Sequence, residues 1–155
     1  MNLHKMLVAR AEAGRPVKVG LIGAGKFGAM FLTQARRTAG VHLVGIADLD
    51  PGRARDVLAL TGWDRAASAA TDLRQARDGG GTCVLDDAAA LIALDGLEVI
   101  IEATGDPKSG IRHCRAAIRH GVNVVMVNVE ADVVAGPLLA REAQAAGVIY
   151  SLAWG

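Results

Sequence analysis

The sequence predicts a doubly wound α/β fold, in which helices cover both faces of a parallel sheet. A short apolar run over residues 17–22 ends in the pattern Gly-x-Gly-x-x-Gly over residues 23–28. A helix-period pattern follows at once, and a second apolar run over residues 41–47 ends at Asp48. Short apolar runs that alternate with helical patterns are typical of βαβ units. We expect all 155 residues to form one such domain.

The glycines of residues 23–28 have separate physical tasks. Gly23 permits the tight turn from strand to helix, Gly25 lets a pyrophosphate approach the backbone, and Gly28 lets helix and strand pack closely. The phosphates would lie on the free N–H groups at the positive end of the new helix. The residues predicted to bind them are Gly23, Ala24, Gly25, Lys26, Phe27 and Gly28.

Asp48 completes the pattern. Its carboxylate lies 20 residues after Gly28, about where an acid reaches the ribose hydroxyls of adenosine. Strand, glycines, helix, strand and acid in one register indicate a dinucleotide-binding unit of the Rossmann type, with NAD or NADP as the cofactor. The acid favours NAD, whereas Arg53 and Arg55 just beyond it keep NADP open.

Composition excludes several classes of protein. The net charge of +1 gives no electrostatic argument for binding nucleic acid or an acidic surface. No apolar run approaches the ~20 residues of a membrane span, and the first residues lack the apolar core of a signal peptide. We therefore expect a cytoplasmic protein that binds no membrane. Cys83 and Cys114 have no metal or redox spacing and are expected to be reduced and buried, and no metal site is predicted.

An extra helix is predicted within residues 1–16, before the first strand. Leu3, Met6, Leu7 and Ala11 share one helical face, and a glycine and a proline then end the helix. The helix either covers the outside of the domain or contacts another subunit.

Further helices and one strand fill residues 27–85. The helix after the glycines is expected to bury the face that carries Phe27, Met30, Phe31 and Ala35. Asp50 is expected to cap a helix that begins at Pro51 and runs to about Thr61. Residues 63–81 form an insert with some alanine-rich helix and no evident chemistry, and residues 82–85 are a short strand.

The next strand, residues 97–102, brings Ala103, Thr104 and Gly105 to its carboxyl end. Ligands of doubly wound sheets bind in the crevice outside the carboxyl ends of the strands. These three residues are therefore predicted to contact the cofactor, although Asp106 also fits a simple helix cap. The helix that follows is expected to bury Ile111, Cys114 and Ile118. Its polar side is expected to be solvated and carries Arg112, His113, Arg115, Arg119 and His120.

Polar residues also follow the strand predicted over residues 122–127. Asn128 and Glu130 are the candidates for substrate-side catalysis, because they come at a carboxyl strand end. In the alternative interpretation, Glu130 or Asp132 only caps the next helix. That helix is expected to open at Gly136, and residues 148–152 form a last strand.

The order of these motifs resembles the nucleotide-binding domain of homoserine dehydrogenase-like proteins. The matching segments are residues 23–28, 47–48, 102–105 and 124–128. Homoserine dehydrogenases place a catalytic lysine directly after the asparagine that matches Asn128. Val129 stands at that position here, so the resemblance does not extend to homoserine as the substrate.

The sequence is similar in more detail to DRL-like oxidoreductases, which often carry a C-terminal SAF domain. The matching residues are 2–4, 23–28, 128–132 and 136–138. Some members are NADPH-dependent reductoisomerases that convert 1-deoxyxylulose 5-phosphate into methylerythritol phosphate, and the resemblance implies such an activity. Members are longer and add a domain that binds the small-molecule substrate and forms oligomers. The resemblance thus implies a homo-oligomeric protein whose present 155 residues are inactive without that domain.

Two other classes of function stay open. One is a non-catalytic nucleotide-binding or sensing module. The other is a methyltransferase that binds S-adenosylmethionine, since such enzymes also use a glycine turn and a ribose-binding acid. A third glycine at Gly28, which suits close helix packing, favours a dinucleotide.

Overall fold

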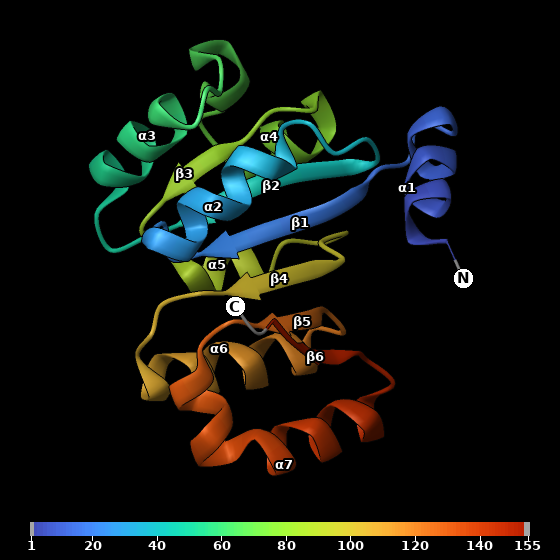
Figure 1. Cartoon of the computed structure of the whole chain (residues 1–155), viewed down its shortest axis with the longest axis vertical. Helices are drawn as coiled ribbons and strands as arrows, with labels where there is room; N and C mark the ends of the chain where they lie inside the picture. The colour runs from blue at the N-terminus through green and yellow to red at the C-terminus, as the bar shows by residue number, and fades with distance from the viewer. Residues whose placement is uncertain (1, 154–155) are drawn as a thin grey trace.

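The computed structural model describes residues 2–153 and contains one six-stranded sheet, with strand order β3-β2-β1-β4-β5-β6 (Figure 1). Every pair of neighbouring strands is parallel. The strands are β1 (Val17–Ile22), β2 (Val41–Ala47), β3 (Cys83–Leu85), β4 (Val99–Glu102), β5 (Asn123–Met126) and β6 (Tyr150–Leu152). The predicted doubly wound fold is therefore confirmed.

Helices cover both faces of this sheet, as a parallel sheet requires. One face packs against α2 (Lys26–Ala35) and α3 (Pro51–Leu60), with Leu21, Leu32, Ile46 and Leu58 in its core. The core of the other face contains Ile22, Val44, Ile100, Met126 and Leu139. In Figure 1, α2 lies in front of the sheet and α5 behind it. The helices of the second face are α4 (Leu73–Gly79), α5 (Ala88–Ile92), α6 (Pro107–Arg119) and α7 (Val129–Ala146).

The strand order reverses between β1 and β4, because β1 lies between β2 and β4. Chain segments therefore leave these two central strands in opposite directions and open a crevice at their carboxyl ends. The short strand β3 is preceded by a 3₁₀ helix over Arg65–Ser68 and by α4, which together make up most of the predicted insert.

Side chains cap the amino ends of nearly all the α-helices. In α1 (Leu3–Glu12), α3, α4, α5, α6 and α7, an Asn or Asp accepts a hydrogen bond from the first helical turn. The exception among the described helices is α2, whose N-cap is Gly25 and has no side chain to offer. The first backbone N–H groups of α2 therefore have no side-chain acceptor at the N-cap.

Two predicted helical features are wrong. On α2, Met30 is exposed, and the buried residues are Gly28, Leu32 and Ala35, so Leu32 rather than Met30 faces the sheet. The helix expected to open at Gly136 begins at Val129 and continues through this glycine and Pro137. It begins early because the Asn128 side chain caps it.

Continuation of α7 past its proline also has a local cause. A Cβ atom at Gly136 would collide with the Asp132 carboxylate, so a larger residue there would require the Asp132 side chain to move. Proline removes one helical hydrogen bond, and burial of Leu139 and Ala143 just beyond it offsets this loss. The helix ends as expected at Gly147, which has a left-handed backbone with φ 71°.

The helix α1 forms as predicted, but it does not cover the domain. None of its residues is buried, and Leu3 and Met6 are exposed by 63% and 54%. In Figure 1 it stands beside the start of β1, away from the helices that cover the sheet. Arg10 attaches it through hydrogen bonds of 2.7 and 2.8 Å to the two carboxylate oxygens of Glu98. A role in subunit contact stays a prediction.

Both cysteines are free and buried, as predicted. Burial, with a smaller effect of the Glu142 and Glu102 charges, raises the pKa of Cys114 to about 12, so this thiol stays protonated and unreactive. None of the described helices is both long and apolar enough to cross a membrane. Residues 2–153 also contain no cluster of three His, Cys, Asp or Glu side chains that could hold a metal ion.

Two adjacent leucines of α7 test the core. Leu139 is fully buried and Leu138 is 45% exposed. We expect Leu139→Ala to lower the free energy of unfolding by about 2–5 kcal/mol, because it leaves a cavity in the core. The matched variant Leu138→Ala should cost within about 0.5 kcal/mol. Urea unfolding followed by circular dichroism measures both, and equal losses would contradict the packing described here.

Candidate functional site

A cleft of about 540 Å³ lies at the carboxyl ends of β1, β2 and β4. The predicted residues Gly23, Gly25, Asp48, Ala103 and Thr104 all line it. Its other walls come from α5 and from the first three turns of α6. The structure thus brings together, from three strand ends, half of the ten residues that the sequence predicted to bind a cofactor.

Two of the three glycines, Gly23 and Gly28, have the steric roles expected of them. Gly23 has φ 97°, and a Cβ atom there would lie 2.7 Å from the Ala103 carbonyl oxygen. A Cβ atom at Gly28 would lie 2.6 Å from the Gly23 carbonyl oxygen, so α2 approaches β1 as closely as glycine allows. At Gly25 a Cβ atom would meet nothing within 4 Å. This glycine is not required for packing within the chain, and its open side lines the cleft.

The amino end of α2 is the natural place for a phosphate in this cleft. The backbone N–H groups of Gly25, Lys26 and Phe27 have no hydrogen-bond acceptor among the described residues. Together with the positive end of the helix dipole, such groups bind anions well. Lys26 is exposed and Phe27 is half-buried in this first turn.

Asp48 connects the glycine loop to the next helix. Its Oδ2 atom accepts a hydrogen bond of 2.7 Å from the Ala24 N–H, and its Oδ1 atom accepts one of 2.9 Å from the Asp50 N–H. Arg53 binds both oxygens through Nη2, at 2.9 and 3.0 Å. The Arg53 side chain is itself 58% exposed and lines the cleft, so it can reach a ligand beside Asp48.

These contacts determine the charge on Asp48. Burial by itself raises the pKa of a carboxyl group, but hydrogen bonds from Ala24 and Asp50 and the Arg53 guanidinium outweigh it. The pKa of Asp48 is therefore lower than its ordinary value of 3.8, and the group is ionised at neutral pH. A carboxylate offers about four acceptor positions, and these four bonds fill them, so ribose hydroxyls would bind Asp48 by taking the place of the bonds from the exposed Arg53 side chain.

A second buried acid, Glu102, lies at the end of β4 and has no exposed surface. Its Oε1 atom accepts a bond of 2.7 Å from the Thr104 hydroxyl and lies 3.1 Å from Nδ1 of His113. Its Oε2 atom accepts a bond of 3.0 Å from Nδ2 of Asn128. Glu102 thus joins the loop after β4, the middle of α6 and the end of β5. The sequence analysis did not assign a role to it; an acid at the end of the apolar run 99–102 was the available signal.

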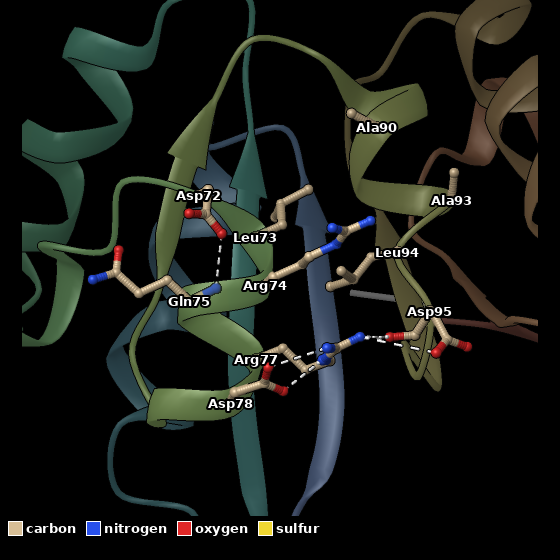
Figure 2. Close-up of a pocket in the computed structure, with 10 residues that line it drawn as sticks. All are labelled: Asp72, Leu73, Arg74, Gln75, Arg77, Asp78, Ala90, Ala93, Leu94 and Asp95. Carbon is tan, nitrogen blue, oxygen red and sulfur yellow. Dashed lines mark hydrogen bonds and ion pairs between the residues drawn. The ribbon is translucent and has the colours of Figure 1, made fainter.

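A larger hollow of about 650 Å³ lies between α4 and α5, near the amino ends of the strands (Figure 2). Figure 2 shows Arg77 reaching towards Asp95, and Arg77 also pairs with Asp78 at 2.7 Å. Three charged side chains of this hollow, Arg77, Asp78 and Asp95, pair with one another. Ligands of doubly wound sheets bind at the opposite ends of the strands. We therefore assign the site to the smaller cleft.

Comparison with protein families identifies the domain. Residues 17–127 match the GFO/IDH/MocA model, described as an oxidoreductase family with an NAD-binding Rossmann fold. The chain belongs to this family. A comparison with curated proteins finds no significant match.

Solved structures share the same fold as this GFO/IDH/MocA domain. A homoserine dehydrogenase from Thiobacillus denitrificans is 22% identical with a TM-score of 0.71, over 89% of this chain and 29% of its own. An oxidoreductase from Agrobacterium radiobacter, solved with NAD⁺, L-tartaric acid and magnesium, is 21% identical with a TM-score of 0.62, over 88% of this chain and 34% of its own. A biliverdin reductase from Synechocystis, solved with biliverdin and NADP⁺, is 19% identical with a TM-score of 0.58, over 88% of this chain and 37% of its own. The chain thus spans about a third of the length of these proteins.

The two predicted catalytic residues do not line the cleft of the GFO/IDH/MocA domain. Asn128 is 2% exposed, and its Oδ1 atom caps α7 through a 3.1 Å bond from the Ala131 N–H. Neither Glu130 nor Asp132 is the cap, which corrects the alternative interpretation. Glu130 is exposed on the first turn of α7, and Gly105 is exposed with φ 74° just outside the cleft. A catalytic role for Asn128 or Glu130 stays a prediction.

The expected solvation of His113 is wrong. Its side chain is 11% exposed and contacts Glu102, because α6 turns this position towards the sheet. Helical spacing alone placed it beside Arg112 on the polar side. A buried acid on a neighbouring strand is a feature of tertiary structure, and the periodicity of α6 does not reveal it.

Asp48→Asn tests the link between the glycine loop and α3. We expect the variant to lose about 1.5–3 kcal/mol of unfolding free energy near neutral pH, because it weakens hydrogen bonds to a charged group. The pKa of Asp48 is depressed in the folded state, so its stabilisation is present above pH 3.8 and is lost as the pH falls through the folded pKa. The difference between wild type and variant should therefore shrink below pH 3.8 in urea unfolding. The exposed Asp86→Asn serves as the control, and a difference that persists in acid would refute the assignment.

Proposed function

We propose that this chain is the coenzyme-binding domain of an NAD(P)-dependent oxidoreductase, and that it binds the dinucleotide in the cleft at the carboxyl ends of β1, β2 and β4. One observation carries the proposal: α2 is the described α-helix that begins without a side-chain cap, at a glycine whose open side faces the cleft. Membership in the GFO/IDH/MocA family supports the same cofactor.

The residues present fit such a cofactor. The N–H groups of the first turn of α2 would hold the pyrophosphate, and Asp48 would accept the adenosine ribose hydroxyls. Thr104 and the backbone of Ala103 would contact the nicotinamide half, because they lie at the end of β4 beside the glycine loop. The bound nicotinamide supplies hydride transfer, while the protein residues orient it and exclude water.

The preference between NAD and NADP depends on Asp48 and Arg53 together. A lone carboxylate would repel the 2′-phosphate of NADP. Here the Arg53 guanidinium lies on that carboxylate and is more than half exposed, so it can also pair with a phosphate. We propose that the domain binds both coenzymes, with the ribose hydroxyls on Asp48 and the 2′-phosphate on Arg53.

The finer proposal is a DRL-like reductoisomerase that acts on 1-deoxyxylulose 5-phosphate. Its support is the sequence resemblance over residues 128–132 and 136–138. Under this proposal the full protein is a cytoplasmic homo-oligomer, and a further domain supplies the substrate-binding cations. The 155-residue chain is then expected to bind coenzyme and to turn over no substrate. This proposal also predicts apolar surface over residues 148–154, where the further domain or a partner subunit would pack. Ile149, beside the edge strand β6, is 66% exposed, and Trp154 lies outside the described residues.

A non-catalytic nucleotide-sensing module is the second candidate. It is favoured by the polar groups at the ends of β4 and β5, because Glu102, Thr104 and Asn128 are bonded to one another rather than free for acid–base work. Calorimetric titration with NADH, NADPH and S-adenosylmethionine separates the classes of ligand. Binding of S-adenosylmethionine alone would overturn the proposal, and coenzyme oxidation by an extended protein that includes the further domain distinguishes an enzyme from a sensor.

Gly25→Val tests the position of the pyrophosphate. The added side chain enters the open side of the loop, and the backbone at φ −77° accepts any residue, so the fold should survive. We expect the affinity for NADH to fall by at least about 100-fold, which corresponds to about 2.7 kcal/mol. Circular dichroism and calorimetry on one sample measure fold and binding together. Tight binding by the folded variant would place the phosphates elsewhere.

Arg53→Ala tests the 2′-phosphate. A hydrogen bond to a charged group contributes about 1.5–3 kcal/mol, so NADPH should bind about 10–150-fold more weakly. NADH should change much less, since Asp48 keeps both backbone N–H bonds. The control is Arg55→Ala, whose guanidinium contacts the carbonyl oxygens of Pro51 and Val84 instead of Asp48. An equal loss of NADH and NADPH affinity in the Arg53 variant would contradict this role.

A further inference from the structure

His113 is a cleft residue with one ring nitrogen already committed. Its Nδ1 atom lies 3.1 Å from the Glu102 Oε1 atom, and Glu102 has no exposed surface. The ring is nearly buried, yet it lines the cleft from the first half of α6. Its orientation is therefore fixed from behind by a buried acid, while its other edge faces the ligand space.

The second ring nitrogen, Nε2, is accessible and has no protein partner. No described residue forms a hydrogen bond with it, and the described residues contain no buried side-chain nitrogen or oxygen atom without a partner. Nε2 must therefore keep some exposed surface, which the cleft provides. A carboxylate oxygen accepts hydrogen bonds, so Nδ1 is the ring nitrogen that donates to Glu102, and in the tautomer with its single proton on Nδ1 the Nε2 atom is an acceptor.

The adenine base is the part of a dinucleotide that this region of the cleft would receive. With the pyrophosphate at Gly25 and the adenosine ribose at Asp48, the base lies beyond Asp48 on the side of α5. Much of the wall there is apolar and suits the faces of a flat ring: Leu49, Ala88, Ala89, Ile92 and Ala116. Asp87 also lines the cleft, where its Oδ1 atom accepts a hydrogen bond from the Ala90 N–H. Leu49 is 97% exposed directly after Asp48, so it is free to cover a bound base.

We infer that Nε2 of His113, held by Glu102, accepts a hydrogen bond from the exocyclic amino group of the adenine base. The inference rests on the proposed dinucleotide function and adds a base-reading residue to it. A fixed acceptor distinguishes adenine from hypoxanthine, since hypoxanthine carries a carbonyl oxygen in place of the amino group and would face Nε2 with an acceptor.

A rival acceptor is present in the same cleft. Asp86 lines it at the end of β3, but its side chain is exposed and therefore well solvated. Arg112 also lines the cleft and is a donor only, so it cannot accept from an amino group. These two residues give matched control variants.

The test compares the dissociation constants of NADH and its hypoxanthine analogue, nicotinamide hypoxanthine dinucleotide. The wild-type chain should prefer NADH by about 3–10-fold, as one neutral hydrogen bond provides. In His113→Asn the shorter amide can still bond Glu102 but does not reach the cleft, so the preference should fall to near unity. In His113→Gln the amide oxygen can take the place of Nε2, so this variant should keep part of the preference for NADH. Asp86→Asn and Arg112→Gln should leave the preference unchanged.

A direct measurement in the wild-type chain guards against a variant that does not fold. With ¹⁵N-histidine labelling, the Nε2 resonance of His113 should shift on addition of NADH and shift less with the hypoxanthine analogue. If the wild-type chain binds neither NADH nor NADPH, the proposed function fails. The base-reading role fails, while dinucleotide binding stands, if the wild-type chain binds NADH no more tightly than the analogue. It also fails if the His113→Asn variant keeps the preference for NADH, or if the Asp86→Asn variant loses that preference.

Discussion

The organisation of the crevice depends on the hydrogen bonds of the buried Glu102 side chain. A polar group without exposed surface is unfavourable unless hydrogen bonds replace its water. Thr104, His113 and Asn128 provide these bonds, and each belongs to a different segment around the ends of β4 and β5. One buried group therefore holds two loops and α6 in fixed positions behind the cleft.

Asp48 has the corresponding role on the other side of the crevice. It bonds the backbone of the glycine loop at Ala24 and the start of α3 at Asp50, while Arg53 neutralises it from the solvent side. The two acids differ in access to a ligand. Asp48 and its arginine line the cleft, whereas Glu102 lies behind it and acts through the groups that it orients. Beside these hydrogen-bonded acids, one helix end, that of α2, keeps its donors open.

The sequence predicted the elements of the fold well, because their signals are local. Apolar runs gave the strands, and Asp50 and Asp106 were recognised as helix caps from neighbouring residues alone. The errors have a common origin in packing. Periodicity could not decide between Met30 and Leu32 as the buried residue of α2, since both are apolar and two positions apart. The Gly136-Pro137 pair looked like a helix start, but the helix cap at Asn128 and the buried residues beyond the proline determined the actual helix.

Sequence by itself determined the glycine loop of this GFO/IDH/MocA domain, because the glycine positions and the spacing to Asp48 are constraints on the backbone. Gly23 and Gly28 are required by contacts of a Cβ atom with main-chain atoms, which any chain with this turn would share. Only the tertiary structure decided the roles of Glu102, His113 and Asn128. Their side chains meet across two strands and a helix, and the energy of a buried hydrogen-bonded group depends on neighbours that lie 2 to 26 positions apart in the chain. Helix and strand periodicity does not predict such contacts between distant side chains. The role of Glu102 in organising the crevice therefore follows only from the tertiary structure.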